Sequence, residues 1–101
     1  MRVIAKKTLR DFWTKYSDAE ESLKAWHAEA EDAAWSTPAE IKAKYGSASI
    51  LKNSRMVFNI CGNKYRLVVK FNYACGDRQG VAYIRFVGTH KQYDQIDAET
   101  I

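Results

Sequence analysis

Apolar residues change their spacing near the middle of the chain. Before residue 46 they recur every three or four positions, as Leu9, Phe12, Trp13 and Tyr16 do, which places them on one face of a helix. After it, apolar and polar residues alternate, which is typical of strands with one buried face. The pattern therefore predicts helices in the first half and a sheet in the second.

Capping signals divide the helical half. Ser17 and Glu20 have the spacing of a capping box, which predicts that a helix begins near residue 18. Thr37 before a proline is a second such signal. The predicted elements are a short strand at residues 2–5, a helix containing Leu9 to Tyr16, a second helix from about residue 18, and a third from Pro38 to about Tyr45. Trp13, Trp26 and Trp35 fall at helix-stripe positions, so we expect them in the core.

Three β-rich runs follow a predicted loop at residues 47–54: residues 55–61, 64–73 and 81–87. Gly62-Asn63 predicts a two-residue hairpin turn, which fixes the pairing of the first two runs. This register places Phe58 opposite Leu67 on the apolar face and Asn59 opposite Arg66 on the polar face. It leaves the pairing of the last run, and the side taken by Arg85, open.

These elements predict an α+β fold, in which N-terminal helices pack on one face of a small antiparallel sheet. The other face would be concave, polar and basic. At 101 residues, the chain is expected to form a single domain over residues 1–101.

Charge is unevenly distributed along the chain. Residues 17–40 hold seven acids and only Lys24 as a base, whereas residues 52–93 hold eight Lys and Arg and a single acid, Asp77. A concentrated positive face favours binding to a phosphate backbone. The longest apolar run is four residues, Val81 to Ile84, which excludes a membrane-spanning segment and a signal peptide. We therefore expect a cytoplasmic protein with no membrane partner.

Metal ligands and cofactor motifs are scarce. The chain holds two cysteines, Cys61 and Cys75, and two histidines, His27 and His90, without metal-ligand spacing or a glycine-rich phosphate loop. We therefore expect free thiols, no metal and no cofactor. His27 lies on an acidic helix with no evident partner, so we expect it to be structural or exposed.

His90 is the strongest candidate for chemistry, because it follows the last predicted strand and has Lys91 and Tyr93 nearby. Imidazole transfers protons near neutral pH. If a helical turn follows the strand, Tyr93 lies beside His90. With Arg66, these groups could cleave RNA without metal, using the substrate's 2′-OH as nucleophile. A helix cap or a surface residue is the simpler interpretation of a lone histidine.

The remaining candidates are cations that could contact RNA. They are Lys52, Arg55, Lys64, Lys70, Arg85 and Lys91. Three functions fit such a surface: an endoribonuclease, an RNA- or ribosome-binding domain without turnover, and a subunit that holds a partner protein on the acidic segment 17–40. A pure RNA-binding domain has no need of His90 and Tyr93.

Two stretches resemble the HigB toxins of the RelE-like superfamily. They are Asn59-Ile-Cys-Gly-Asn-Lys-Tyr-Arg-Leu-Val68 and Tyr83-Ile-Arg-Phe-Val-Gly-Thr-His-Lys-Gln-Tyr-Asp94. Ile4-Ala-Lys-Lys-Thr-Leu9 and Met56-Val-Phe-Asn59 fit as well, so the resemblance covers nearly the whole chain.

The resemblance implies a ribonuclease that cleaves messenger RNA on the ribosome. It also implies a HigA-type antitoxin with a helix-turn-helix fold, and binding to operator DNA only through the toxin–antitoxin complex. Arg66 matches a phosphate-stabilising position of the superfamily. His90 falls where RelE-type toxins often have an arginine, and Asn59 falls where RelE has a catalytic lysine. Tyr93 stands in for the C-terminal tyrosine of RelE, and the identity of the base stays open.

Overall fold

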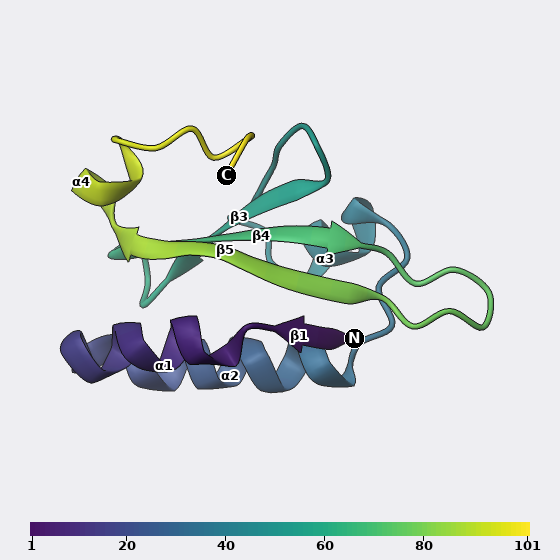
Figure 1. The fold of residues 1–101 in the computed structure, drawn as a ribbon, viewed down its shortest axis with the longest axis horizontal. Coiled ribbons are helices and arrows are strands. Elements are labelled where there is room, and N and C mark those ends of the chain that lie inside the picture. Colours follow the sequence, from purple (N-terminus) through teal and green to yellow (C-terminus); the bar gives the residue numbers. More distant parts are fainter.

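A computed structural model describes all 101 residues and contains a five-stranded sheet in the order β1-β5-β4-β3-β2. The strands are β1 (Arg2–Ile4), β2 (Ser49–Ile50), β3 (Arg55–Ile60), β4 (Tyr65–Asn72) and β5 (Val81–Thr89). The helices are α1 (Lys6–Lys15), the 3-10 turn η1 (Ser17–Ala19), α2 (Glu20–Asp32), α3 (Pro38–Lys44) and α4 (His90–Tyr93). Figure 1 shows α1 and α2 side by side below the sheet, with α4 and the C-terminal segment above it.

The β3–β4 hairpin has the predicted register. Phe58 pairs with Leu67, and Asn59 pairs with Arg66. The turn between the strands supplies backbone with positive φ at Cys61 (φ 56) and Gly62 (φ 69). The geometry of a hairpin turn fixes the register of its two strands. This turn therefore decides which side chains of β3 and β4 stand opposite one another.

The predicted α+β class is confirmed: β2, β3, β4 and β5 pair in antiparallel fashion, and the parallel pairing of β1 makes the sheet mixed. β1 lies at the edge and pairs with β5 in parallel, with Ile4 opposite Tyr83. Two residues of the predicted loop, Ser49 and Ile50, form the opposite edge strand and pair with β3. Short edge strands leave little alternating pattern in the sequence, which is why their pairing was missed.

A β-bulge in β5 settles the register of the last strand. Val68 pairs with Phe86 and Val69 pairs with Ile84, so Arg85 has no partner in β4. The side chain of Arg85 is exposed.

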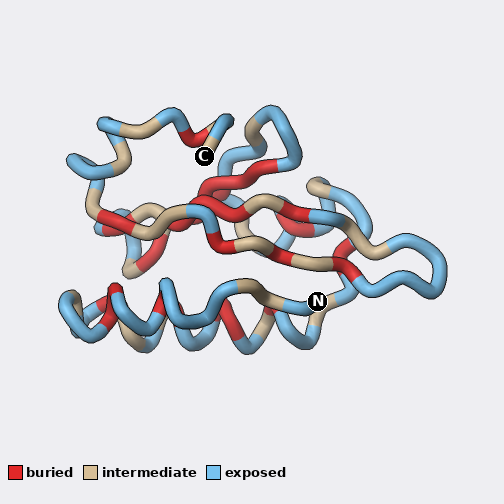
Figure 2. Tube along the Cα trace, in the orientation of Figure 1, coloured by how far each residue is buried: buried red, intermediate tan, exposed pale blue.

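The main core lies between the helices and one face of the sheet. Leu9, Leu23 and Ile41 of the helices are fully buried, as are Phe58 and Leu67 of the sheet. Trp13, Trp26 and Trp35 are buried in the same core, which confirms their predicted role. Figure 2 shows the buried positions concentrated along the strands and on the sheet-facing side of α1 and α2.

Helix boundaries follow one of the two capping signals. The Thr37 side chain accepts a hydrogen bond from the Glu40 N–H at 3.3 Å, and α3 begins at Pro38 as predicted. Ser17 makes no capping bond, and the chain passes through η1 before α2 begins at Glu20. None of the helices is long and apolar enough to cross a membrane.

The second face of the sheet is partly covered, which corrects the prediction of an open polar surface. The C-terminal segment, residues 94–101, follows α4 and lies across this face (Figure 1). Its Ala98 is buried against Val57 and Val68, with Ile96 and Ile101 packed around them. The face is apolar here because Val57 and Val68 point toward this segment, so burial against it removes their side chains from water.

Candidate nucleic-acid interface

His90 is the first residue of α4, where the chain leaves β5. Thr89 caps this turn: its side chain accepts a bond from the Gln92 N–H at 3.2 Å, and the Gln92 side chain accepts one from the Thr89 N–H at 2.9 Å. This capping box fixes the direction in which the chain turns after the strand. A helical turn thus follows the strand, and it places Tyr93 one turn after His90.

Gly88 allows this turn to form. A Cβ atom at this position would lie 2.5 Å from Cζ of Phe86 and 2.7 Å from Oε1 of Gln92, the oxygen that caps Thr89. Only a residue without a side chain fits while both neighbours keep their places. A glycine at the end of a strand pattern can signal such a close approach, and this signal was not used in predicting the site.

Arg66 and His90 converge on one atom, the carbonyl oxygen of Asn63. Arg66 Nη1 donates to this oxygen at 3.3 Å and to the Tyr65 carbonyl at 3.3 Å. His90 Nε2 hydrogen-bonds to the same Asn63 oxygen. Asn63 was recognised only as a turn residue, because a main-chain carbonyl leaves no trace in the side-chain pattern.

The Asn63 contact assigns the two nitrogens of the imidazole. A carbonyl can only accept a hydrogen bond, so His90 Nε2 carries the proton in this contact. In the neutral ring Nδ1 is then unprotonated and can accept a proton. The His90 side chain is exposed and Arg66 is half-buried, so both are reachable from solvent.

Tyr93 and Asn59 lie on the same side of the sheet as Arg66. The Tyr93 ring packs 6.4 Å from that of Phe86, centroid to centroid, beside the cluster of Val57 and Val68. Asn59 stands opposite Arg66 across the β3–β4 pairing, and its side chain donates to the Ser47 carbonyl at 3.1 Å. An amide does not titrate near neutral pH, so Asn59 can orient a ligand but cannot act as a base.

Lys64 is paired with an acid of the helical layer. Its ammonium group contacts the carboxylate of Asp18, which also accepts a bond from the Tyr65 hydroxyl at 2.6 Å. The hydrogen bond from Lys64 lowers the pKa of Asp18, and the same bond raises the pKa of Lys64. Part of the charge of Lys64 is therefore neutralised within the protein.

Arg55 lies under the C-terminal segment, and Lys52 lies beside it. Arg55 is buried, and its guanidinium donates to the carbonyl oxygens of Ile101 and Asn53. Lys52 is exposed, and its main-chain N–H donates to the Glu99 carboxylate at 3.2 Å. The C-terminal segment thus occupies the donors of Arg55, which corrects the expectation of a surface residue there.

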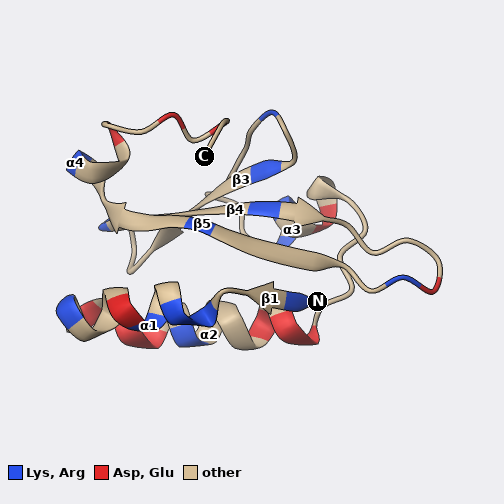
Figure 3. Cartoon of the chain, viewed as in Figure 1, with Lys and Arg blue, Asp and Glu red and all other residues tan.

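Of the six predicted cations only Lys64 forms an ion pair, and the side chains of Lys52, Lys70, Arg85 and Lys91 have no partner within the protein. Lys91 is exposed and adjacent to His90 in the chain, whereas Lys70 is half-buried and four residues beyond Arg66 on β4. Figure 3 shows basic residues on β3, β4, β5 and α4, and acidic residues mainly on α2 and in the C-terminal segment, whereas α1 is mostly basic. No group of three or more His, Cys, Asp and Glu is arranged to hold a metal ion.

The helices and the five-stranded mixed sheet define a small α+β protein. A family model described as HigB toxin, a RelE-like toxic component of a toxin–antitoxin system, matches residues 19–96. The chain therefore belongs to the HigB toxin family. The match includes α2, α3, α4 and the strands from β2 to β5. A search of curated proteins finds no significant match. A toxin of this kind has an antitoxin as its partner.

Proposed function

We propose that this toxin is an endoribonuclease that cleaves messenger RNA on the ribosome without a metal ion. The observation that carries the proposal is the convergence of Arg66 and His90 on the Asn63 carbonyl oxygen. A phosphate oxygen beside this carbonyl would lie within reach of Nε and Nη2 of Arg66, which make no hydrogen bond within the protein, and of the His90 ring. Two donors aimed at one oxygen are what stabilises negative charge that develops on a phosphate.

In the proposed reaction the 2′-oxygen of a ribose attacks the adjacent phosphorus. A bond forms between the 2′-oxygen and phosphorus, and the bond from phosphorus to the 5′-oxygen breaks. One group removes the 2′-hydroxyl proton and another protonates the leaving 5′-oxygen. The products are a 2′,3′-cyclic phosphate and a 5′-hydroxyl.

We assign the proton transfer to His90 and the stabilisation of phosphate charge to Arg66, with Lys91 as a further cation. Tyr93 is the second candidate for proton transfer, since it follows His90 by one helical turn and its hydroxyl makes no hydrogen bond within the protein. Asn59 orients the substrate beside Arg66. The remaining contacts with RNA come from Lys70 and Arg85, with Lys52 and Lys64 at the margins. Arg55 is assigned no contact, because it is buried and its guanidinium donates to Ile101 and Asn53.

No carboxylate lies among these groups to act as a strong general base. Positioning of the substrate must therefore supply part of the rate acceleration. Correct placement alone can lower the activation barrier by up to about 7–11 kcal/mol. A messenger RNA held by the ribosome is placed in this way. We further propose that the antitoxin is of the HigA type, with a helix-turn-helix fold, and that the toxin reaches operator DNA only through it.

The proposal is tested by mapping transcript ends after the toxin is produced in cells and in a purified translation mixture. We expect cuts within translated messages and cyclic phosphate at the new 3′ ends, which is the product of attack by the 2′-oxygen. Translation arrest without cuts, equal for wild type and His90→Ala, would instead indicate an RNA- or ribosome-binding protein without turnover. New ends that carry a 5′-phosphate and a 3′-hydroxyl, as metal-dependent hydrolysis leaves, would contradict the mechanism.

A further inference from the structure

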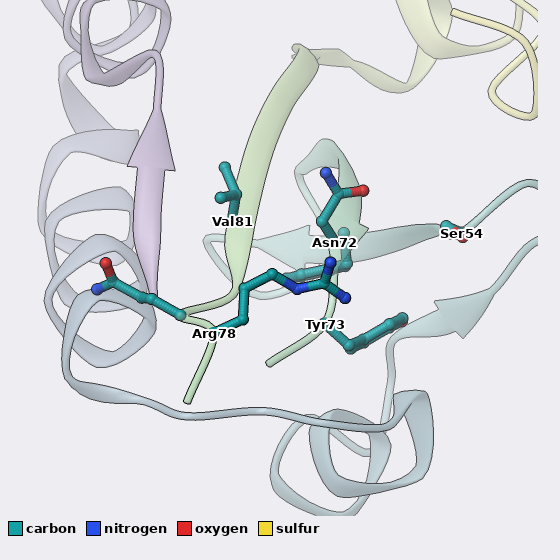
Figure 4. A pocket seen from close by; sticks show the side chains of 7 residues that line it. Ser54, Asn72, Tyr73, Arg78 and Val81 are labelled. Carbon is teal, nitrogen blue, oxygen red and sulfur yellow. The ribbon is translucent and has the colours of Figure 1, made fainter. Parts of the chain in front are cut away.

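A hollow lies at the opposite end of the β4–β5 pairing from His90. Arg66 pairs with Gly88 at one end, and Asn72 pairs with Val81 at the other. Six residues along β4 separate the ends, which is about 20 Å at the usual rise of a strand. The hollow has a volume of about 450 Å³ and is lined by Ser54, Phe71, Asn72, Tyr73, Arg78, Gln79 and Val81 (Figure 4). This volume is in the range of small-molecule sites.

The polar side chains of this hollow are unused by the protein. Those of Ser54, Asn72, Arg78 and Gln79 make no hydrogen bond to the rest of the chain, and Arg78 has no acid within ion-pair distance. Figure 4 shows the Arg78 side chain extending into the hollow, with its guanidinium group directed between Asn72 and Tyr73. One positive charge, two amides and a hydroxyl are thus left with their hydrogen-bonding capacity available.

The walls that present these groups are held in place. The turn that carries Arg78 is closed by two main-chain hydrogen bonds with Cys75, at 2.9 and 3.1 Å. Ala74 N–H donates to the Trp35 carbonyl at 3.0 Å, which ties the start of the loop to the helical layer. At its end, a Cβ on Gly80 would lie 2.6 Å from the Met1 side chain and 2.9 Å from the Ala74 nitrogen, so the backbone there is closely packed.

An aromatic ring completes the site. The Tyr73 ring is stacked on that of Phe71, with centroids 5.6 Å apart and an angle of 18° between planes. The stacking fixes the ring, while Tyr73 still lines the hollow and is half-buried. Bases of single-stranded RNA stack on such rings, and amide side chains bind base edges.

We propose that this hollow binds one nucleotide of an RNA, with the phosphate at Arg78, the base against Tyr73, and the base edge at Asn72 and Gln79. The inference rests on the proposed function for its biological ligand. It deepens that proposal by giving the toxin a second contact with RNA, about 20 Å along the sheet from the cleavage site. Asp77, the one acid near Arg78 in sequence, is not among the lining residues.

The test uses adenosine 5′-monophosphate and the main-chain amide signals of the full chain in nuclear magnetic resonance spectra at constant salt. We expect saturable shifts of the amides at residues 72–81. Arg78→Gln should weaken this binding about tenfold, because a charge-assisted bond to phosphate is lost. Arg10→Gln removes the same charge from an exposed position on α1 and should leave the binding unchanged.

Three results would overturn the inference: no shifts at residues 72–81, equal binding by Arg78→Gln, or equal shifts with inorganic phosphate, which would indicate an anion site and not a nucleotide site. The titration measures binding and requires no cleavage. The amide shifts at residues 72–81 are evaluated separately from those of amides near Arg66 and His90. Nucleotide binding at residues 72–81 without any ribonuclease activity would therefore contradict the proposed function and support the nucleotide site. RNA cleavage without these shifts would support the proposed function and contradict the nucleotide site.

Discussion

Arg66 and His90 share a hydrogen-bond acceptor, the carbonyl oxygen of Asn63, although 24 positions separate them in the sequence. The β4–β5 pairing brings them together, because Arg66 stands opposite Gly88 and the capped turn after Thr89 directs His90 back toward the hairpin. The hairpin turn, the last strand and the short helix thus each contribute one part of the same arrangement.

Replacing either member of the pair should reduce activity strongly. We expect His90→Ala to lower the rate of RNA cleavage about 10²- to 10⁴-fold, which is the usual contribution of a positioned acid or base. Arg66→Ala should cost about 10²-fold or more, as loss of a donor to developing charge does. Growth of cells producing each variant and the cleavage rate are the measurements. Arg10→Ala on α1 is the matched control for Arg66, and full toxicity of both site variants would refute the assignment.

Gly88→Ala should disturb the site through packing alone. The added methyl group would meet Phe86 and the Gln92 oxygen that caps α4, and overpacking of this kind costs about 1–3 kcal/mol. We expect Gly88→Ala to have a lower midpoint of urea unfolding than the wild type. We also expect a lower rate of RNA cleavage, because His90 is displaced. Gly46→Ala is the control, since a Cβ there has no neighbour within 4 Å. Equal stability of the two variants would show that α4 is not held in the manner described.

Lys91 and Lys64 should differ in how they affect RNA binding. Lys91 is unpaired, so Lys91→Gln should reduce the slope of log affinity against log salt by about 0.7 for one lost phosphate contact. Lys64 already contacts Asp18, so Lys64→Gln should change the slope less and should lower thermal stability instead. Binding of a short RNA across a series of salt concentrations separates the two. A larger change of slope in Lys64→Gln would contradict this ranking.

His27 should make stability depend on pH. Contrary to expectation it has a partner, with Nδ1 3.2 Å from a Glu31 oxygen, but burial dominates and lowers the pKa of His27 below 6.5. Between pH 6.5 and that lower value, the unfolded chain binds a proton that the folded chain does not. Stability is therefore fully present above pH 6.5 and falls as the pH decreases through this window.

Urea unfolding at pH 7.5 and at pH 5.5 measures the effect, with His27→Gln as the comparison. The variant should lose less stability between these two pH values than the wild type. An identical loss in both proteins would mean that other groups cause the pH dependence.

The sequence predicts the parts of the fold that depend on local chemistry. The register of β3 and β4 follows from the turn at Gly62-Asn63, and the start of α3 follows from Thr37 and Pro38. The bulge at Arg85 and the parallel pairing of β1 depend on contacts between distant segments, which one sequence does not encode locally. For the candidate site, the side chains of Arg66 and His90 could be selected, but their common acceptor is a main-chain atom.

The position of residues 94–101 has a consequence for how RNA can be held. These residues cover Val57, Val68 and the donors of Arg55, so the middle of the sheet offers little surface to a polynucleotide. A strand of RNA that reaches His90 therefore contacts the margin of the protein and not the middle of the sheet. We expect detached RNA to bind loosely there, and a transcript already immobilised by a larger assembly to react much faster.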